Sequence, residues 1–570
     1  MLSIILIWLY IAVICLAYGC GGAALLRILL QEGESGRLPF SLIVIFGLGV
    51  ITTIVGYLSL FIKIGLVANV IMLLGALLLY AAFSGEINAT VRDGFYRLFH
   101  LNRYVLILLL IIFLFVLVKS TNLPYSYDTG LYHAQALRWI AEYPGVPGLG
   151  NLHGRLAFNS AWFLPQALFS FSFLYPQSFH VLNGFFLLII VISSMDGLSN
   201  LLQKKYNFNN ILKSGLSIPV ILTFKDQLCT PTPDIPVLLL ICALLIYYFQ
   251  NKEDAGNLQS NLISVMMVLL AVWTVTIKLS ALPLVLCAGV IMGREVIRRR
   301  PVNLLLIGGL ALGTVLPFFL RNIVISGYLV YPFPALDWFA FDWKIPPAEV
   351  LKEKRAIEVF ARDPKGIAGQ ELAQGMVFWL PIWFHQTVTE YGLKLQKVFL
   401  PSLLLGLDWA YQAMLARRFG LRIGAISQNK LPFLIVAAGL IFWFLTAPDM
   451  RFGMGFFVVG AILIFMPLLQ TFDFRVTKIF PWGVGLLLLY FLVAFLATEV
   501  PLMSPRLYLP APYPQASLAV ATIQGKTVYY PQGNKEEKCW NAPLPCTPSN
   551  PAERQFTFRG ETLEQGFKPR

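Results

Sequence analysis

The chain has 570 residues, of which 57% are hydrophobic, 14% aromatic and only 13% charged, and its formal net charge is +14. Soluble globular domains carry about 25% charged residues, so this composition excludes an ordinary soluble protein. The positive charge does not indicate nucleic-acid binding, because the sequence has neither a soluble basic domain nor a readable nucleic-acid motif. The composition predicts a polytopic membrane protein.

Long uncharged stretches predict the membrane-spanning helices. Residues 39–62 and 105–118 contain no charged side chain, and in hydrocarbon a helix satisfies its backbone groups internally. The alternation that a β-barrel requires is absent. The apolar N-terminus lacks the basic region of a signal peptide and predicts a retained first helix. The expected spans, about fourteen in all, are roughly 2–30, 39–62, 65–84, 104–118, 179–201, 210–224, 235–250, 262–277, 280–293, 303–320, 398–415, 431–447, 453–470 and 480–498.

Basic residues predict which side of the membrane each loop faces. Lys and Arg gather in loops near residues 92–103, 204–213, 252, 294–300, 417–430 and 475–478, which the positive-inside rule assigns to the cytoplasmic side. The outer side then holds the loops 119–178, 225–234 and 321–397, turns near 278 and 448–452, and the tail 500–570. Three regions are expected: N-terminal transmembrane helices in 1–103, a transmembrane core in 104–499, and an outer lobe in 500–570.

The first outer loop opens with PYSYDTGLYH at residues 124–133. From Asp128 onward, the spacing predicts an amphipathic helix along the membrane surface. Its apolar face holds Tyr132, Ala136, Trp139, Ile140 and Tyr143, and its polar face holds Gln135, Arg138 and Glu142. Asp128 suits the N-cap of that helix, where a short acceptor satisfies unpaired backbone amides. The same carboxylate, at the boundary of water and lipid, also suits a base for a membrane-bound substrate. His133 is either structural or a group that orients Asp128.

Further charged residues occur in the other outer loops. They are the cations Lys225, Lys278, Arg321 and Arg451 and the carboxylates Asp226, Asp234 and Asp449. Ordinary explanations exist: Asp234 can begin a helix, Arg321 can extend its charge to the interface, and the neighbouring Asp449 and Arg451 can form a local ion pair. As a set, the cations suit a phosphate or pyrophosphate headgroup. The carboxylates Asp128, Asp226 and Asp234 suit proton abstraction or binding of a divalent metal.

The seven cysteines fall into two groups. Five are ordinary small hydrophobes in apolar helices or a short loop: Cys15, Cys20, Cys229, Cys242 and Cys287. Cys539 and Cys546 instead close the proline-rich loop KCWNAPLPC in the tail. Because the tail is expected to face an oxidising space, this pair predicts a disulfide. Zinc is disfavoured, since no nearby histidine completes a tetrahedral site.

The order of these features resembles the GT-C superfamily of membrane glycosyltransferases. The shared layout is a first large outer loop that opens with an acid, a surface helix, many further spans and a C-terminal outer lobe. The strings YDTGLYHAQALRWI, GNLHGRLAFNS, TPTPDIP, RNIVISGYLVYPFP and APDMRF also resemble an uncharacterised family of bacterial multi-pass membrane proteins, over most of the chain from about residue 119. The resemblance implies an all-α, GT-C-like bundle of about fourteen transmembrane helices in the bacterial inner membrane.

The resemblance also implies an activity. Members of the superfamily transfer a sugar from a polyprenyl-phosphate-linked donor to an acceptor on the outer face, which can be a glycan, a lipid or a protein. They keep an acid in the first outer loop as the catalytic base, and Asp128 matches it. Lys278, Arg321 or Arg451 would then stabilise the departing phosphate.

The chain departs from one common pattern of that superfamily. Some relatives have a second acid directly after the first, where this sequence has Thr129. A second acid, or a ligand for a divalent metal such as Mg or Mn, would then come from Asp226 or Asp234. The cofactor requirement stays open.

Two other functions stay open as well. A polysaccharide polymerase or lipid-linked ligase would use a donor on pyrophosphate. A transporter or flippase usually has internal repeats and polar groups near the bilayer midplane; no repeat is evident, although Asp408 lies inside a predicted span. The loop 321–397 suits surface helices that cover the site, and the tail 500–570 either positions an acceptor or caps the bundle.

Overall fold

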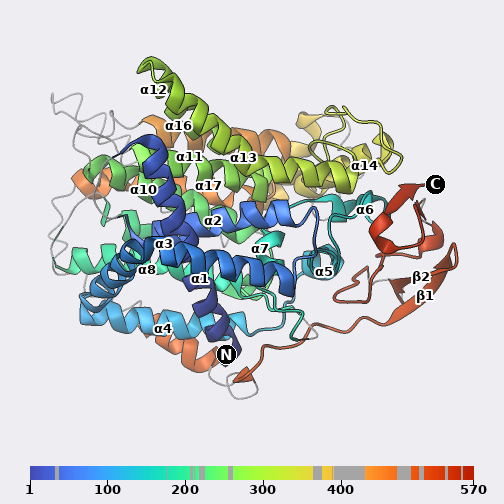
Figure 1. The fold of residues 1–570 in the computed structure, drawn as a ribbon, viewed down its shortest axis with the longest axis horizontal. Helices are drawn as coiled ribbons and strands as arrows, with labels where there is room; N and C mark the ends of the chain where they lie inside the picture. The colour runs from blue at the N-terminus through green and yellow to red at the C-terminus, as the bar shows by residue number, and fades with distance from the viewer. Residues whose placement is uncertain are drawn as a thin grey trace.

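The computed structural model describes residues 1–570 except 33–37, 176–177, 204, 206–208, 211, 217–224, 255–260, 364–374, 388, 390–429, 472–488, 500–505, 533–536 and 554–555. The predicted span 398–415, with Asp408, lies outside the described residues, and the predicted spans 210–224 and 480–498 lie partly outside them. Figure 1 shows long helices packed side by side, with the short helices α5 (Ala134–Glu142) and α6 (Leu149–Leu152) and the strands gathered at one end. We call this the site end.

The long helices make this chain a mainly helical membrane protein. Among the described residues, eight helical segments are long and apolar enough to cross a membrane: α1 (Leu2–Leu30), α2 (Phe40–Leu58), α3 (Leu66–Phe99), α4 (Arg103–Ser120), α8 (Leu182–Leu202), α10 (Asp234–Asp254), η4 with α12 (Leu279–Leu284 and Val285–Ile297) and α13 (Pro301–Ser326). The other apolar helices are α11 (Asn261–Ile277), α16 (Lys430–Thr446) and α17 (Met450–Thr471). The described residues therefore do not reach the predicted number of about fourteen spans.

Helix α3 is kinked close to the predicted end of a span. The sequence predicted a span over 65–84 and a basic loop after it, and two helical segments of α3 meet at a kink at Phe83. The residues after the kink are helical as far as Phe99 and do not form a loop. Residues 85–99 contain no proline that would end a helix. Arg97 consequently lies on the same helix as Asp93, one turn away, and forms an ion pair with it at 3.2 Å.

Glycines allow α1 and α2 to pack with their backbones close together. A Cβ atom on Gly19 would lie 2.1 Å from the carbonyl oxygen of Ile43, and one on Gly47 would lie 1.9 Å from that of Cys15. Neither position can hold a larger residue without separating the two helices. Such close approach through small residues is typical of helix pairs in membranes, where dispersion contacts drive association.

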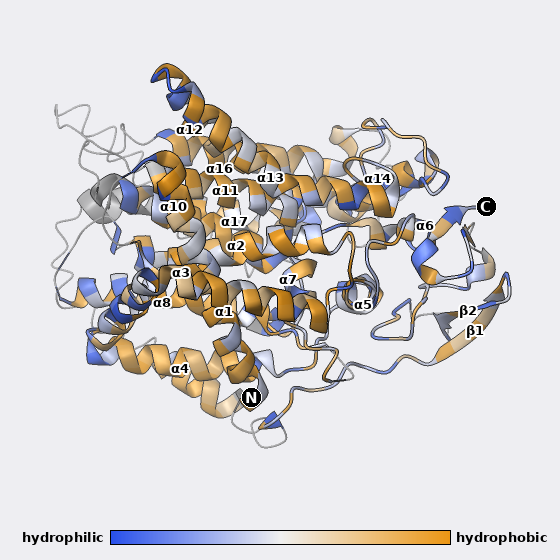
Figure 2. Ribbon diagram, in the orientation of Figure 1, coloured by the Kyte–Doolittle hydropathy of each residue, from blue (hydrophilic) through white to orange (hydrophobic). Residues whose placement is uncertain are grey.

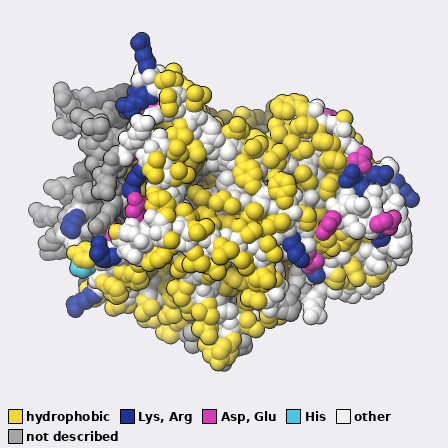
Figure 3. All heavy atoms as spheres, viewed as in Figure 1, with side chains coloured by type: hydrophobic (Ala, Val, Ile, Leu, Met, Phe, Trp, Pro, Cys, Tyr) yellow, Lys and Arg dark blue, Asp and Glu magenta, His cyan; other side chains and the backbone are white. Residues whose placement is uncertain are grey.

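The outer surface of the bundle is apolar. Leu78 on α3 is 72% exposed and Leu305 on α13 is 76% exposed, as expected for helices that face lipid. Figure 2 shows hydrophobic residues along the lengths of the helices. Figure 3 shows a broad apolar face, with charged side chains gathered toward its two ends. This distribution fits a chain whose long axis in the view crosses the membrane.

Short elements build the site end. They are the π-helical turn η1 (Thr129–His133), α5, α6, the 3-10 turn η2 (Gly154–Ala157), α7 (Phe163–Leu168), the 3-10 turn η3 (Lys225–Gln227) and α14 (Pro347–Arg362). The tail adds two antiparallel pairs of strands, β1 (Leu518–Ile523) with β2 (Lys526–Pro531) and β3 (Phe556–Phe558) with β4 (Phe567–Pro569). The C-terminal lobe therefore adds strands and short 3-10 turns to the helical bundle. The β1–β2 turn places Gln524 and Gly525 at positive φ, as a tight hairpin turn requires.

The predicted surface helix after Asp128 exists but is buried. Ala136, Trp139 and Ile140, on its predicted apolar face, are buried as expected. Gln135, predicted on the exposed face, is only 1% exposed. Its amide donates hydrogen bonds to the carbonyls of Trp540 at 3.0 Å and Ala542 at 2.9 Å. The C-terminal lobe covers the side of this helix that the sequence had left to solvent.

Candidate functional site

The site centres on an ion pair between Asp128 and Arg451. Asp128 precedes the π-helical turn η1, and Arg451 lies in the first turn of α17. The Arg451 Nη1 atom lies 2.8 Å from the Asp128 Oδ2 atom. Arg155, in η2, approaches the other carboxylate oxygen at 3.7 Å. The Asp128 side chain is 20% exposed, so the pair is partly shielded from solvent and the attraction is stronger than at an open surface.

Asp128 does not cap its helix as the sequence predicted. The helix begins at Tyr127, so Asp128 lies within its first turn, and its carboxylate accepts no capping hydrogen bond. The Ser126 hydroxyl oxygen instead accepts a bond from the Thr129 backbone N–H at 3.1 Å. Ser126, directly before the helix, therefore takes the capping role that the sequence predicted for Asp128. This arrangement leaves the carboxylate of Asp128 for Arg451 and for a ligand.

The charges around Asp128 hold it ionised. Burial by itself would raise the pKa of this carboxyl group, but the positive charges of Arg451 and Arg155 and the hydrogen bond from Arg451 lower the pKa below its ordinary value. An ionised carboxylate accepts hydrogen bonds and does not donate them. Asp128 is thus ready to bind a hydroxyl group throughout the physiological pH range.

A second ion pair lies beside the first. The Lys278 ammonium donates a hydrogen bond to the carboxylate of Asp234, at the start of α10. The Phe452 ring joins the two pairs, because Lys278 Nζ lies 3.9 Å from its centroid and the Arg451 guanidinium carbon lies 4.9 Å from it. Cations over a ring face are attracted by its quadrupole. Two acids and two cations from separate loops therefore share one cluster.

Asp449 completes the cluster from the turn before α17. Its carboxylate accepts a hydrogen bond from the Arg451 backbone N–H at 2.9 Å and lies 3.7 Å from the Arg451 Nε atom. Burial raises the pKa of Asp449, and the charge of Arg451 opposes this only in part. The neighbouring residues Asp449 and Arg451 do form the local ion pair that their spacing suggested, but Arg451 also reaches Asp128.

His133 is buried beneath this cluster. It is 1% exposed, and neither ring nitrogen has a hydrogen-bond partner among the described residues. Its ring packs against Tyr132 and Phe163, with centroid distances of 4.4 Å and 5.2 Å. Burial lowers the pKa of His133 to about 4, although the charge of Asp128 opposes that effect. His133 is therefore neutral near pH 7, and within the described residues it makes no hydrogen bond that could orient Asp128.

Two residues of the site, Arg155 and Glu353, were not predicted from the sequence. Arg155 lies between Asp128 and Glu353, with its Nε atom 3.2 Å from a Glu353 carboxylate oxygen. Glu353 is on α14, whose Phe360 ring also contacts the Arg451 guanidinium at 5.2 Å. The charged run of α14 indicated a helix that covers the site, but its spacing gave no sign of which acid faces inward.

Two predicted residues, Asp226 and Arg321, are not part of this cluster. Asp226 is in another ion pair, with Lys119 at 3.1 Å, and its side chain is 69% exposed. Arg321 donates hydrogen bonds to Asn159 and Ser59. Lys225 begins η3. Of the predicted cations and carboxylates, the structure thus brings Lys278 and Arg451 together with Asp128 and Asp234.

The donor set does not fit the divalent metal that was considered. Within the described ranges, no group of three or more His, Cys, Asp or Glu side chains is arranged to hold a metal ion. Asp128 and Asp234 are each paired with a cation, which competes with metal binding. We derive no step that uses a metal.

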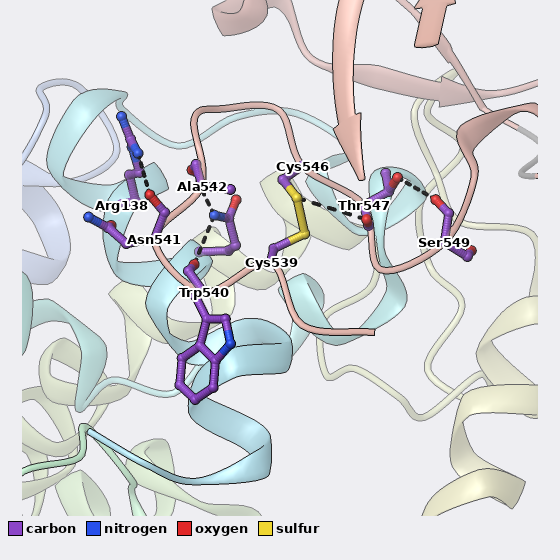
Figure 4. Close-up of a disulfide and its surroundings, with 9 residues drawn as sticks. Arg138, Cys539, Trp540, Asn541, Ala542, Cys546, Thr547 and Ser549 are labelled. Atoms are coloured by element: carbon purple, nitrogen blue, oxygen red, sulfur yellow. Dashed lines mark hydrogen bonds between the residues drawn. A yellow bond between two sulfur atoms is a disulfide. The ribbon is translucent and has the colours of Figure 1, made fainter. Parts of the chain in front are cut away.

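The C-terminal lobe fixes the backbone just after Asp128. Its predicted disulfide, Cys539–Cys546, is present and closes a short loop, which Figure 4 shows beside Arg138. The Trp540 backbone N–H donates to the Gly130 carbonyl at 2.9 Å, and Arg138 donates to the Asn541 carbonyl at 2.7 Å. A Cβ atom on Gly130 would lie 2.9 Å from the Trp540 ring, so only glycine allows this contact.

The fold and the site define a polytopic membrane protein with a cluster of acid–cation pairs at one end of its helix bundle. The chain belongs to the family described as Domain of unknown function (DUF8201), whose model matches residues 1–458. That range includes all of the ion-pair cluster and none of the C-terminal lobe. No curated protein matches the chain, and no solved structure matches it.

Proposed function

We propose that this chain is a GT-C-type glycosyltransferase of the bacterial inner membrane, which moves a sugar from a polyprenyl-phosphate-linked donor to an acceptor on the extracytoplasmic face. The observation that carries the proposal is the Asp128–Arg451 pair: an ionised carboxylate from the first large loop, held at the end of an apolar helix bundle. The resemblance of the loop layout to GT-C enzymes supports the same assignment.

In the proposed reaction, Asp128 accepts a hydrogen bond from the acceptor hydroxyl group. The hydroxyl oxygen attacks the anomeric carbon of the donor, the bond from that carbon to the phosphate oxygen breaks, and its electron pair leaves with the lipid phosphate. The hydroxyl proton passes to Asp128. Because the lowered pKa makes Asp128 a weak base, we place the proton transfer late, after the bond to the leaving group has lengthened.

Arg451 couples the two halves of this reaction. While Asp128 is ionised, it compensates the charge of Arg451 at 2.8 Å. When Asp128 takes up the proton, that compensation is lost, just as negative charge develops on the phosphate. Arg451 can then interact with the leaving group, and electrostatic stabilisation of this kind acts mainly in the transition state.

The test is turnover by the purified protein in lipid nanodiscs. Wild type, Asp128→Asn and Asp226→Asn are incubated with a panel of polyprenyl-phosphate hexoses and an extract of native membrane lipids and glycans, and released polyprenyl phosphate is measured. Asp226 is a matched control, because it is a carboxylate in another ion pair. We expect Asp128→Asn to lose at least about 100-fold in rate, and Asp226→Asn to lose little. Normal turnover by well-folded Asp128→Asn would remove Asp128 as the base.

Two further outcomes separate the alternative functions. Reaction only with donors on pyrophosphate would favour a polymerase or lipid-linked ligase. Movement of an unmodified lipid-linked sugar across liposomes, without release of polyprenyl phosphate, would favour a transporter or flippase.

A further inference from the structure

Arg321 is a buried cation without a counter-ion. It lies near the end of α13 and is only 6% exposed. Its Nε atom donates to the Asn159 side chain at 3.1 Å, and its Nη1 atom donates to the Ser59 hydroxyl at 2.9 Å. Within the described part of the chain, no carboxylate forms an ion pair with it. This contrasts with Lys278 and Arg451, which face Asp234 and Asp128.

Two hollows meet at Arg321. The first is lined by residues of the α5–η2 region, including Trp139 and Phe158, and the second by residues of α2, α11 and α13, including Thr52 and Trp273. Asn159 and Arg321 line both hollows. Arg321 therefore forms the boundary between a hollow at the site end and a hollow deeper in the helix bundle.

Each hollow also has a buried donor without an acceptor. The indole N–H groups of Trp139 and Trp273 are buried and have no hydrogen-bond partner among the described residues. Trp139 lines the first hollow and Trp273 the second. A buried donor without an acceptor destabilises the fold, and so does a buried charge without a counter-ion. Two unpaired indole N–H groups and the buried guanidinium of Arg321 therefore line this region.

The chemistry of these groups indicates their ligand. A guanidinium and two indole N–H groups only donate hydrogen bonds, so the ligand must supply acceptor oxygens and negative charge. Arg binds phosphate through parallel N–H donors. In the described residues, Arg321 donates its hydrogen bonds from Nε and Nη1, and none is donated from Nη2. α13 presents much of its length to lipid, which gives a membrane lipid a route to the second hollow.

We propose that Arg321, with Trp139 and Trp273, forms an anion site that binds a phosphate monoester separately from the Asp128 cluster. Both hollows are small, so binding of a phosphate group requires flanking side chains such as Phe158 and Phe318 to move. Phe158 and Phe163 line the first hollow and also contact Tyr132 and His133. An aromatic layer thus separates this anion site from the Asp128 cluster, and the inference does not depend on glycosyl transfer.

Ligand-induced thermal stabilisation of the full-length protein in a non-ionic detergent tests the site. The probes are dodecyl phosphate, dodecanol and inorganic phosphate, each titrated against wild type, Arg321→Gln and the double variant Trp139→Phe/Trp273→Phe. Trp338→Phe is the matched control, because Trp338 is 66% exposed and lines neither hollow. Asp128→Asn is included to keep this test separate from that of the proposed function.

Dodecyl phosphate, but not dodecanol, is expected to stabilise wild type, Trp338→Phe and Asp128→Asn. Arg321→Gln should bind it at least about tenfold more weakly, and the tryptophan double variant about threefold or more. The double variant keeps the buried charge of Arg321, so it stays informative if Arg321→Gln folds poorly. Equal stabilisation by inorganic phosphate would support the anion site and identify free phosphate as its source. Unchanged affinity in the double variant, or equal stabilisation by dodecanol, would overturn the proposal.

Discussion

Asp128 and Arg451 are 323 residues apart in the chain, yet their side chains meet at 2.8 Å. The pair joins the first loop of the site end to the first turn of α17. Removing either partner would leave the other charge partly buried, and that penalty is the physical basis of the first prediction.

Replacing Arg451 by Gln should impair both stability and turnover. Asp128 and Asp449 would lose their shared cation, and the pKa of Asp128 should rise because burial would no longer be opposed by Arg451. The Arg451 side chain is 36% exposed, so solvent screening limits the expected loss of stability to about 1–2 kcal/mol. Thermal unfolding in detergent measures it. Arg97→Gln, which breaks an exposed helical pair, should cost less than about 0.5 kcal/mol; an equal loss in both variants would contradict the role of Arg451.

The buried histidines should make stability fall at acid pH. Burial lowers the pKa of His133 to about 4 and that of His180 to about 3, so the unfolded chain binds protons near pH 6.5 while the folded chain resists them. Stability is complete above about pH 6.5 and falls as the pH drops toward 4, by up to about 3 kcal/mol for each histidine. Melting temperatures between pH 7.5 and 4.5 check this.

The matched variants for this pH effect are His133→Phe and His100→Gln. His133→Phe should show a shallower fall than wild type, because it removes one of the resisting groups. His100→Gln should leave the fall in stability unchanged, because His100 is exposed. A slope for His133→Phe as steep as that of wild type would rule out His133 as a source of the acid sensitivity.

Substituting Gly130 by Ala should disturb the segment that carries Asp128. The new Cβ atom would lie 2.9 Å from the Trp540 ring, so the loop 539–546 must shift and the hydrogen bond from Trp540 to Gly130 would weaken. We expect a loss of about 1–3 kcal/mol, typical of overpacking, and reduced turnover. Gly85→Ala is the control, since a Cβ atom there has nothing within 4 Å. Wild-type stability in Gly130→Ala would show that the lobe does not hold this segment rigidly.

The Cys539–Cys546 disulfide should also help to hold the segment that follows Asp128. Replacing Cys539 and Cys546 together by Ser releases a loop closed over a sequence separation of 7, which the loop-entropy relation values at about 2–3 kcal/mol. Limited proteolysis should then cut the tail faster, and turnover should fall because Gln135 and Arg138 bind carbonyl groups of this loop. Proteolysis at the wild-type rate would indicate that the lobe is held by its other contacts.

The sequence determined the features that depend on neighbouring residues. Runs of apolar side chains long enough to cross hydrocarbon predicted the membrane class and most of the long helices, because each helix satisfies its own backbone and needs no partner for that. The same local reading predicted the helix after Asp128 and the Cys539–Cys546 loop. It erred where a distant segment intervened: Gln135 is buried because the C-terminal lobe covers it.

Only the tertiary structure decided which charges meet. Asp128 is paired with Arg451 and not used as a helix cap, Asp226 pairs with Lys119, and Arg155 with Glu353 enters the site without a sequence signal. The partner of a charged side chain depends on how helices that are far apart in the chain pack together. The same packing buries Arg321 without an acid beside it among the described residues. Local sequence carries the hydrophobic lengths that place helices in a membrane, but not the distances between their ends.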